Sequence, residues 1–365
     1  MISSRKGRLL FVLPALPDYE PYVYNYIRLA KDHSVDFDVI CWNRKGKEVS
    51  FPDNYYVYQH PTNDSFPPIK KMVEIVGFCS YVRRVIRKKR YRLVFTFTIA
   101  DSVFLAPYLK RKYKGRYVFD IRDYSPVVKS RFFKNRFNSL LSHSAVNVIS
   151  SEGFKSWLPA GHDYIICHNT DLEKIRQSID YTDSDSGKRE RASILTIGAL
   201  RDFSANKRVI DAFADSAAFH LDFVGEGNAT AALKQYCEDN VVRNVTFYGR
   251  YQKEEEDAFV KECNMMNLIM SHNMISDYLM SNRFYLAARF RKPIIVNDGS
   301  FQAEQVKKYD LGLVVTDSCQ MDETVEAYWN SIDWSRHETN CLRFLEDVNN
   351  EQSHFETTIA ELIKE

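Results

Sequence analysis

Glycine and basic residues follow one another where an apolar run ends in the second half of the chain. Gly198 ends the run Ser193–Gly198, and Arg201 and Lys207 come after it, six residues apart. A glycine at a strand end lets a ligand approach the backbone, and an Arg beside a Lys suits a diphosphate. Two surface cations in front of a helix are the alternative. The spacing alone leaves both interpretations open.

Two later apolar runs end in the same way. Gly225, Glu226 and Gly227 close the first, and Tyr248 and Gly249 close the second. The first is not a dinucleotide fingerprint, because Thr230 stands where a third glycine would be. Each turn is either an ordinary tight turn or a place where a ligand meets the backbone.

A helix is predicted over Ser281–Phe290, followed by Lys292-Pro293 and another strand. Ser281 is a good N-cap residue, and the free N–H groups of a helix N-terminus attract anions. Ser281, Asn282 and Arg283 are therefore candidate ligand-binding residues. The alternative is that this helix only completes the core.

The elements that must position these residues alternate along the chain. Near-continuous apolar strands between amphipathic helices are typical of parallel sheets covered on both faces. Seven strands are predicted in the first half: 8–13, 37–42, 55–59, 93–98, 117–121, 147–150 and 164–167. Six are predicted in the second: 193–198, 220–224, 245–248, 268–271, 293–296 and 313–315.

The expected architecture is α/β, with two Rossmann-like, doubly wound domains facing a cleft that holds the ligands. A helix is expected over Ile69–Lys89, where apolar residues recur at helical spacing: Met72, Ile75, Val76, Cys79, Val82 and Ile86. Separate helices are expected over 324–332, 336–348 and 355–364. The first domain is predicted over 1–170 and the second over 171–349.

The composition of the chain limits the class of protein and the cofactors that can be expected. The 365 residues are 45% hydrophobic and 27% charged, which indicates a globular chain, and no apolar run reaches the ~18 residues of a membrane span. Seven widely spaced cysteines favour reduced thiols in a cytoplasm. The nine histidines lack metal-ligand spacing, and Asp183-Ser184-Asp185 lies in a polar stretch interpreted as linker. No metal or other cofactor is expected.

Charge is distributed unequally. Residues 1–170 carry 28 Lys and Arg against 14 acidic residues, a net charge of +14, and the rest carries 22 against 34, a net charge of −12. Tyr81–Leu93 alone holds seven basic residues, and Phe132-Phe133 lies between others. This pattern fits an anionic membrane surface, or simply a solvated face. No nucleic-acid-binding module is recognisable.

In order and spacing, these motifs resemble the donor half of GT-B glycosyltransferases, in particular family-4-type enzymes of bacterial surface polysaccharide synthesis. In that family an Arg and a Lys clamp the donor diphosphate, which Arg201 and Lys207 match. The family's Val-Gly-x-Gly and Phe-x-Gly turns match 224–227 and 247–249, and its Pro-Asn-Lys helix matches 281–293. The resemblance covers most of the chain and is strongest over 193–316.

The chain also departs from the family. Its paired Glu-x7-Glu would fall at Tyr278 and Leu286, so neither carboxylate is present. Arg291 replaces the usual Gly before Lys-Pro, and Pro14–Glu20 replaces a glycine-rich loop. The resemblance nevertheless implies a nucleotide-sugar donor bound by Gly198, Arg201, Lys207, Gly225, Glu226, Tyr248, Gly249, Ser281, Asn282 and Arg283.

The resemblance implies roles in the first half as well. Asp101, Asp120 and Asp123 follow or end strands and would lie near the acceptor and the transferred sugar. Asp120 and Asp123 are the candidate catalytic carboxylates, with Arg201 and Lys207 stabilising the leaving diphosphate, and Asp101 and Asp123 contact substrate. The alternative for the aspartates is a structural Asp–Arg pair. The final helix, 350–365, would cross back to the first domain.

The function expected from the sequence is transfer of a sugar to a saccharide or lipid-linked acceptor in capsule, O-antigen or exopolysaccharide synthesis. The resemblance implies retention of the anomeric configuration, and the departures from the family leave inversion open. The protein would be cytoplasmic, with a peripheral contact on the inner face of the membrane. Two alternatives remain: a non-catalytic GT-B partner subunit, and a nucleotide-sugar epimerase of the same architecture. The epimerase would need an array of catalytic carboxylate and histidine groups that the sequence does not reveal.

Overall fold

The computed structural model describes residues 7–63, 65–179, 191–214, 216–317 and 320–365. These residues form two compact units. The N-terminal unit comprises Met1–His168 with Glu351–Glu365, and the C-terminal unit comprises Asn169–Asn350. The Asp183-Ser184-Asp185 stretch lies outside the described residues.

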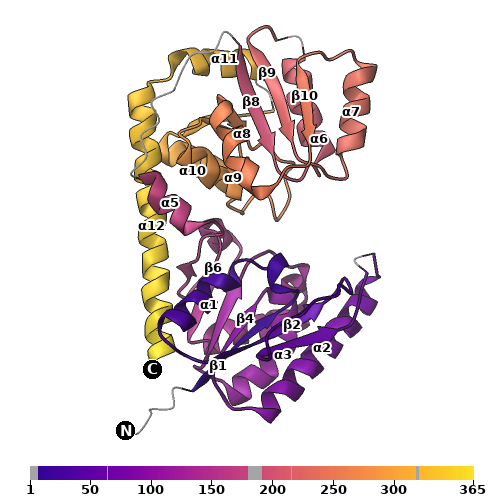
Figure 1. Ribbon diagram of the computed structural model, residues 1–365, viewed down its shortest axis with the longest axis vertical. Helices are drawn as coiled ribbons and strands as arrows, with labels where there is room; N and C mark the ends of the chain where they lie inside the picture. The colour runs from indigo at the N-terminus through magenta and orange to yellow at the C-terminus, as the bar shows by residue number, and fades with distance from the viewer. Residues whose placement is uncertain (1–6, 64, 180–190, 215, 318–319) are drawn as a thin grey trace. The chain divides into compact units, whose positions relative to one another are not determined.

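A seven-stranded parallel sheet forms the centre of the N-terminal unit, in the order β3-β2-β1-β4-β5-β6-β7 (Figure 1). Its strands are β1 (Arg8–Leu13), β2 (Phe37–Asn43), β3 (Tyr55–Gln59), β4 (Tyr91–Phe97), β5 (Tyr117–Ile121), β6 (Val146–Ile149) and β7 (Ile165–Ile166). Every residue from Leu9 to Leu13 is buried, because helices cover both faces of the sheet.

Four α-helices and three short 3-10 turns surround this sheet. They are η1 (Pro17–Tyr19), α1 (Val23–Asp32), α2 (Pro68–Lys88), α3 (Ile99–Lys112), η2 (Pro126–Lys129), α4 (Arg131–His143) and η3 (Glu152–Ser156). Tyr26 of α1 lies at the centre of the core, its ring 5.3 Å from that of Phe95 and 5.1 Å from that of Phe355. The end of the chain thus completes the N-terminal core.

Only the second half of α2 packs as the apolar spacing predicts. Cys79, Val82 and Ile86 are buried, but Met72 and Val76 are 40% and 43% exposed. The predicted helix is confirmed, and its apolar residues are buried in the second half and partly exposed in the first.

The C-terminal unit contains a six-stranded parallel sheet in the order β10-β9-β8-β11-β12-β13. Its strands are β8 (Ala192–Ile197), β9 (Phe219–Val224), β10 (Val245–Gly249), β11 (Met265–Asn267), β12 (Ile294–Asn297) and β13 (Gly312–Val315). Hydrophobic clusters fill both faces. The doubly wound α/β prediction is therefore confirmed in both halves, although β11 ends before the predicted strand at 268–271 begins.

The helices of this unit are α5 (Leu172–Ile179), α6 (Phe203–Phe213), α7 (Thr230–Asp239), η4 (Lys253–Glu255), α8 (Glu256–Glu262), α9 (Asn282–Arg289), α10 (Phe301–Tyr309) and α11 (Met321–Ser331). The last helix, α12 (Trp334–Lys364), begins in this unit and ends in the N-terminal unit. The prediction of separate helices at 336–348 and 355–364 is wrong, since α12 is one helix of 31 residues. Polar contacts hold its middle: Asn349 accepts from Arg176 at 3.1 Å, and Gln352 accepts from the His168 amide at 3.2 Å.

No helix of the described residues is long and apolar enough to cross a bilayer. No group of three or more His, Cys, Asp or Glu side chains among them could hold a metal ion. The six cysteines in this part of the chain are buried free thiols.

Candidate functional site

Glycine turns end three neighbouring strands of the C-terminal sheet. Gly198, Gly225 and Gly249 have φ angles of 111°, 122° and 78°, a region that L side chains rarely adopt. The turns are bonded together: the Gly225 amide donates to the Gly249 carbonyl at 2.7 Å. A Cβ at Gly225 would lie 2.0 Å from the Gly198 carbonyl oxygen. Only glycine lets these backbones approach so closely.

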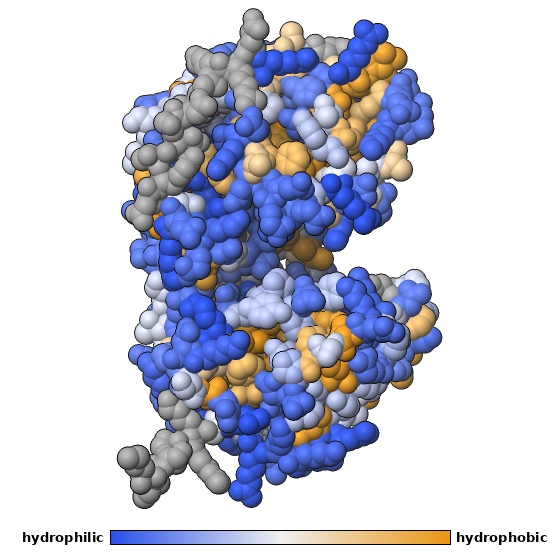
Figure 2. Space-filling view, in the orientation of Figure 1, coloured by the Kyte–Doolittle hydropathy of each residue, from blue (hydrophilic) through white to orange (hydrophobic). Residues whose placement is uncertain are grey.

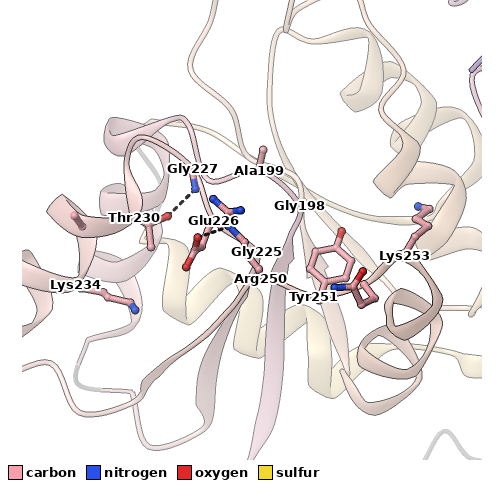
Figure 3. A pocket seen from close by; sticks show the side chains of 12 residues that line it. Gly198, Ala199, Gly225, Glu226, Gly227, Thr230, Lys234, Arg250, Tyr251 and Lys253 are labelled. Carbon is pink, nitrogen blue, oxygen red and sulfur yellow. Dashed lines mark hydrogen bonds and ion pairs between the residues drawn. The ribbon is translucent and has the colours of Figure 1, made fainter. Parts of the chain in front are cut away.

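These turns border a pocket of about 810 Å³ (Figure 3). It is lined by Gly198, Ala199, Gly225, Glu226, Gly227, Thr230, Ala231, Lys234, Arg250, Tyr251, Gln252 and Lys253. The Gly227 amide donates to the Thr230 hydroxyl at 2.9 Å, which secures the turn to the start of α7. The pocket lies at the carboxyl ends of β8, β9 and β10, where parallel sheets bind their ligands.

Cations outnumber anions in this lining. The lining contains three cations, Lys234, Arg250 and Lys253, and one carboxylate, that of Glu226. The Glu226 carboxylate accepts a hydrogen bond from Arg250 Nε at 2.7 Å. Lys253 is paired with Glu256, whereas Lys234 lies near the Phe247 ring, 5.8 Å from its centroid. In Figure 3 the two lysines stand at opposite ends of the pocket. Backbone amides and positive side chains together suit a phosphorylated ligand.

Arg283 adds a further positive charge next to this pocket. It is the second residue of α9, and its charge acts on the phenol of Tyr251, which lines the pocket. Partial burial lowers the pKa of Arg283. Among the described residues no side chain or carbonyl forms a hydrogen bond or ion pair with this guanidinium, and the charge that acts on it is that of Tyr251. A cation that no described residue pairs with is suited to bind an anionic ligand.

The other residues predicted at the start of α9, Ser281 and Asn282, differ in their surroundings. Ser281 occupies the N-cap position, but its hydroxyl donates to Gln302 Oε1 at 2.7 Å rather than capping the helix. Asn282 is exposed at the start of α9. Leu286, at the position of the family's second Glu, is 5% exposed and lies in the hydrophobic core.

The predicted clamp of Arg201 and Lys207 does not form around this pocket. Lys207 Nζ lies 2.5 Å from Asp211 and 4.5 Å from the centroid of the Tyr236 ring, so α6 and α7 hold it between them. Arg201 is exposed and outside the lining. Tyr248 is also outside it, with its ring 5.4 Å from that of Phe259. The direction of these side chains depends on helix packing, which spacing cannot show.

Several lining residues were not predicted from the sequence. Lys234, Arg250, Tyr251 and Lys253 come from α7 and from the segment after β10. Arg250 could have been found, since it directly follows the Phe-x-Gly turn. Lys234 could not, because only the packing of α7 brings it to the pocket.

A second, smaller pocket of about 310 Å³ lies at the ends of β12 and β13. His272 lies there between Asp277, 2.8 Å from Nδ1, and Asn297, 2.9 Å from Nε2. The two carboxylates that line this pocket form ion pairs, Asp298 with Lys307 at 2.7 Å and Asp317 with Arg208 at 2.5 Å. Because its lining contains two carboxylates and neither Lys nor Arg, this pocket is less suited to an anionic ligand than the first.

The N-terminal unit brings carboxylates to the corresponding edge of its own sheet. Asp101 lies in the first turn of α3, after β4, and Asp123 follows β5. Glu20, which the sequence analysis did not single out, follows β1 and η1. Burial, with the charges of Asp123 and Asp101, raises the pKa of Glu20 to about 7. The carboxyl ends of three adjacent strands therefore carry acceptors for hydroxyl groups.

Asp120 lies in a structural pair with Arg122, which is the alternative that the sequence left open for the aspartates. It is 1% exposed and accepts from the Tyr26 hydroxyl at 2.6 Å and from Arg122 Nη2 at 2.5 Å. Burial raises the pKa of Asp120, and the Arg122 charge opposes that rise. Asp101 is also buried, at 4% exposure, and accepts from Thr98 at 3.3 Å. Of the three predicted aspartates, only Asp123 is exposed.

No family model and no curated relative matches the sequence. Solved structures do match. Sucrose-phosphate synthase from Thermosynechococcus elongatus aligns at 12% identity and a TM-score of 0.68, over 93% of this chain and 94% of that one. HepE from Anabaena, in complex with UDP, aligns at 13% identity and a TM-score of 0.67, over 97% and 100% of the two chains. The chain has the GT-B fold.

A third GT-B neighbour is WaaG, described as a glycosyltransferase involved in lipopolysaccharide biosynthesis. It aligns at 12% identity and a TM-score of 0.62, over 96% of this chain and 99% of that one. The N-terminal domain of a trehalose-6-phosphate phosphatase from Candida albicans also matches, with a TM-score of 0.69. Because a protein named as a phosphatase contains this fold, the GT-B fold by itself does not specify a reaction.

Proposed function

We propose that this GT-B chain is a glycosyltransferase that moves a hexose or related sugar from a nucleotide-sugar donor to a saccharide or lipid-linked acceptor. The observation that carries the proposal is the cationic pocket bordered by Gly198, Gly225 and Gly249 at the carboxyl ends of β8, β9 and β10. The backbone amides of its turns, with Lys234 and Arg250, provide donors for a diphosphate. HepE, which shares the fold, has been solved with UDP and with UDP and glucose.

The proposed reaction breaks the bond between the sugar C1 and the diphosphate oxygen and forms a bond from C1 to the acceptor oxygen. The acceptor proton passes to the departing diphosphate, and the anomeric configuration is retained. The protein then contributes positioning and charge stabilisation. Arg283 suits the second role, because no other described residue neutralises its guanidinium.

For the acceptor we propose the carboxylate edge of the N-terminal sheet. Glu20 and Asp123 can accept hydrogen bonds from sugar hydroxyls, and Asp101 borders them. The pathway we propose is the synthesis of a surface polysaccharide, such as capsule, O-antigen or exopolysaccharide, in the cytoplasm. The WaaG likeness supports the pathway, and the free thiols of the described cysteines support the compartment.

One observation favours a second candidate, a non-catalytic subunit that binds the donor without transferring it. The family's second Glu corresponds to Leu286, and this side chain lies in the core, where it can contact no sugar. Such a subunit would keep the donor pocket and have no turnover.

The test has two stages. Thermal unfolding is measured with UDP, GDP, CMP, dTDP and ADP and their sugars, for the native chain, for Lys234→Ala in the pocket and for Lys207→Ala outside it. A ligand at a thousand times its Kd stabilises the fold by about 4 kcal/mol. We expect one nucleotide class to do so, less with Lys234→Ala and unchanged with Lys207→Ala. No stabilisation by any nucleotide would refute the donor pocket.

The second stage uses the bound nucleotide sugar, labelled in the sugar, with bacterial lipid and saccharide extracts. Label that enters an acceptor supports transfer, and NMR of the product shows whether the configuration is retained. Binding without transfer would support the non-catalytic subunit. Conversion of the free donor to its epimer would support an epimerase instead.

A further inference from the structure

Glu226 places a negative charge inside a pocket that otherwise suits phosphate groups. Among the described residues that line this pocket it is the one acid, next to Lys234, Arg250 and Lys253. An exposed Glu–Arg pair is ordinary on a surface that is mostly hydrophilic (Figure 2). In this pocket, however, the carboxylate repels the phosphates that the cations attract. Its place therefore suits a part of the ligand that is uncharged and donates hydrogen bonds.

One oxygen of the Glu226 carboxylate is held by the protein and the other is open. Oε2 accepts from Arg250 Nε at 2.7 Å. Oε1 accepts from no described residue and would lie 3.8 Å from a Cβ placed on Gly249, so it faces the turn that ends β10. The Glu226 side chain is 43% exposed. Because an ionised carboxylate has about four acceptor positions, both oxygens can still accept from a ligand.

The backbone on either side of Glu226 is fixed. The Gly225 amide donates to the Gly249 carbonyl at 2.7 Å, and the Gly227 amide donates to the Thr230 hydroxyl at 2.9 Å. A Cβ on Gly227 would lie 2.2 Å from a neighbouring carbonyl oxygen, so this part of the turn is also tightly packed. The carboxylate is thus presented from a rigid turn rather than from a long loop.

The position of Glu226 in the sheet indicates which part of a nucleotide it meets. Gly198 directly follows β8, and Glu226 lies just beyond the end of β9, the parallel neighbour of β8. In doubly wound sheets the glycine turn after the first strand receives the phosphates, and an acidic residue at the end of the second strand binds the ribose hydroxyls. The strands β8 and β9, joined by α6, have this arrangement.

We propose that Glu226 binds the ribose hydroxyls of the donor nucleotide, so that the pocket selects ribonucleotides over 2′-deoxyribonucleotides. The 2′- and 3′-hydroxyls lie side by side on the sugar and can each donate to one carboxylate oxygen. Arg250 Nε orients the carboxylate, which leaves the Nη groups of Arg250 and the ammonium of Lys234 for the diphosphate. The inference rests on the proposed donor pocket, and it predicts that dTDP sugars are not donors.

Other parts of a nucleotide fit the carboxylate less well. The phosphates carry its own charge. Most bases present an acceptor beside each N–H group, and an acceptor is unfavourable next to a carboxylate. Guanine, with two adjacent N–H groups, is the competing ligand group, and the experiment below separates it from ribose.

The test measures affinity by calorimetry for UDP, GDP and ADP, for the 2′-deoxy form of each, and for inorganic pyrophosphate. It compares the native chain with Glu226→Gln, which keeps the size of the side chain and removes its charge. Glu238→Gln is the matched control, because Glu238 is exposed on α7 and lies outside the pocket lining. Thermal unfolding of each variant shows that it is folded.

We expect the native chain to bind the preferred ribonucleotide at least about tenfold more tightly than its 2′-deoxy form, since a hydrogen bond to a charged group is worth roughly a factor of 10 to 100. Glu226→Gln should reduce this ratio to about threefold or less. It should leave the affinity for pyrophosphate unchanged or increase it, because a negative charge has left the pocket. Glu238→Gln should change none of these values.

Three results would overturn the inference while the donor pocket stands. They are equal binding of ribo and deoxy forms by the native chain, an effect of Glu226→Gln on GDP and dGDP alone, and an equal loss of affinity for nucleotides and pyrophosphate in Glu226→Gln. The second would place guanine against Glu226, and the third would show that Glu226 only maintains the turn. Failure of the native chain to bind any nucleotide would refute the donor pocket itself, and this inference with it.

Discussion

Replacing Arg283 by Met should make the unliganded protein more stable and should weaken its binding of nucleotide. Arg283 is partly buried, its pKa is lowered by that burial, and within the described structure no anion pairs with it. Burying a charge without a partner destabilises the fold. Methionine has a similar length and no charge. We therefore expect Arg283→Met to raise the free energy of unfolding of the unliganded protein by about 1 kcal/mol.

The same substitution should weaken nucleotide binding. A hydrogen bond to a charged group is worth about 1.5–3 kcal/mol, and loss of about 2 kcal/mol raises Kd about 30-fold. At a nucleotide concentration of about 100 times the native Kd, the ligand stabilises the native chain by about 2.7 kcal/mol and the variant by about 0.9 kcal/mol. The two stability curves should cross as nucleotide is added.

The change in stability and the change in nucleotide affinity are both measured by urea unfolding. The experiment uses increasing concentrations of the nucleotide that stabilises the native chain in thermal unfolding. Lys207→Met is the matched control, because Lys207 is paired with Asp211 and lies outside the pocket, so its Kd should be unchanged. An Arg283→Met chain that is less stable without ligand, yet binds nucleotide normally, would show that Arg283 has a structural partner and would refute this reasoning.

Three further predictions concern other positions. Gly225→Ala should destabilise the fold by at least about 2 kcal/mol in urea and abolish nucleotide binding, since φ is 122° and the new Cβ would lie 2.0 Å from the Gly198 carbonyl oxygen; normal binding would contradict the close approach of the turns. The pKa of Glu20 is raised from 4.5 to about 7, so the folded state keeps a proton that the unfolded chain loses, and the free energy of unfolding should fall by about 2 kcal/mol as the pH rises through that window. Glu20→Gln should remove this slope, and an unchanged pH profile would exclude Glu20 as its source. Leu286→Glu should cost about 3 kcal/mol of stability because it buries a carboxylate, and a stable variant would mean that this position is open to ligand.

Much of the fold could be predicted from local pattern. Strands of a parallel sheet covered on both faces are near-continuous apolar runs, so twelve of the thirteen strands were recognisable, with ends displaced by a few residues. The exception is β11, which ends just before the strand predicted at 268–271 begins. The single helix α12 was missed because Asn349–His354 has no apolar spacing. Contacts with Arg176 and His168, distant in sequence, hold that polar stretch helical.

The candidate site was predicted less completely. The sequence by itself determined where Gly198, Gly225 and Gly249 stand, because each ends an apolar run of strand length, and parallel strands bring their ends to one edge. Tertiary structure alone decided which side chains reach that edge. Lys234 and Arg250 line the pocket while Lys207 is held by Asp211 and Tyr236, because the packing of α6 and α7 sets the direction of each side chain. The exposure of Met72 and Val76 in the first half of α2 has the same origin, since apolar spacing shows that a helix has an apolar side, and only the neighbouring elements decide whether that side is covered.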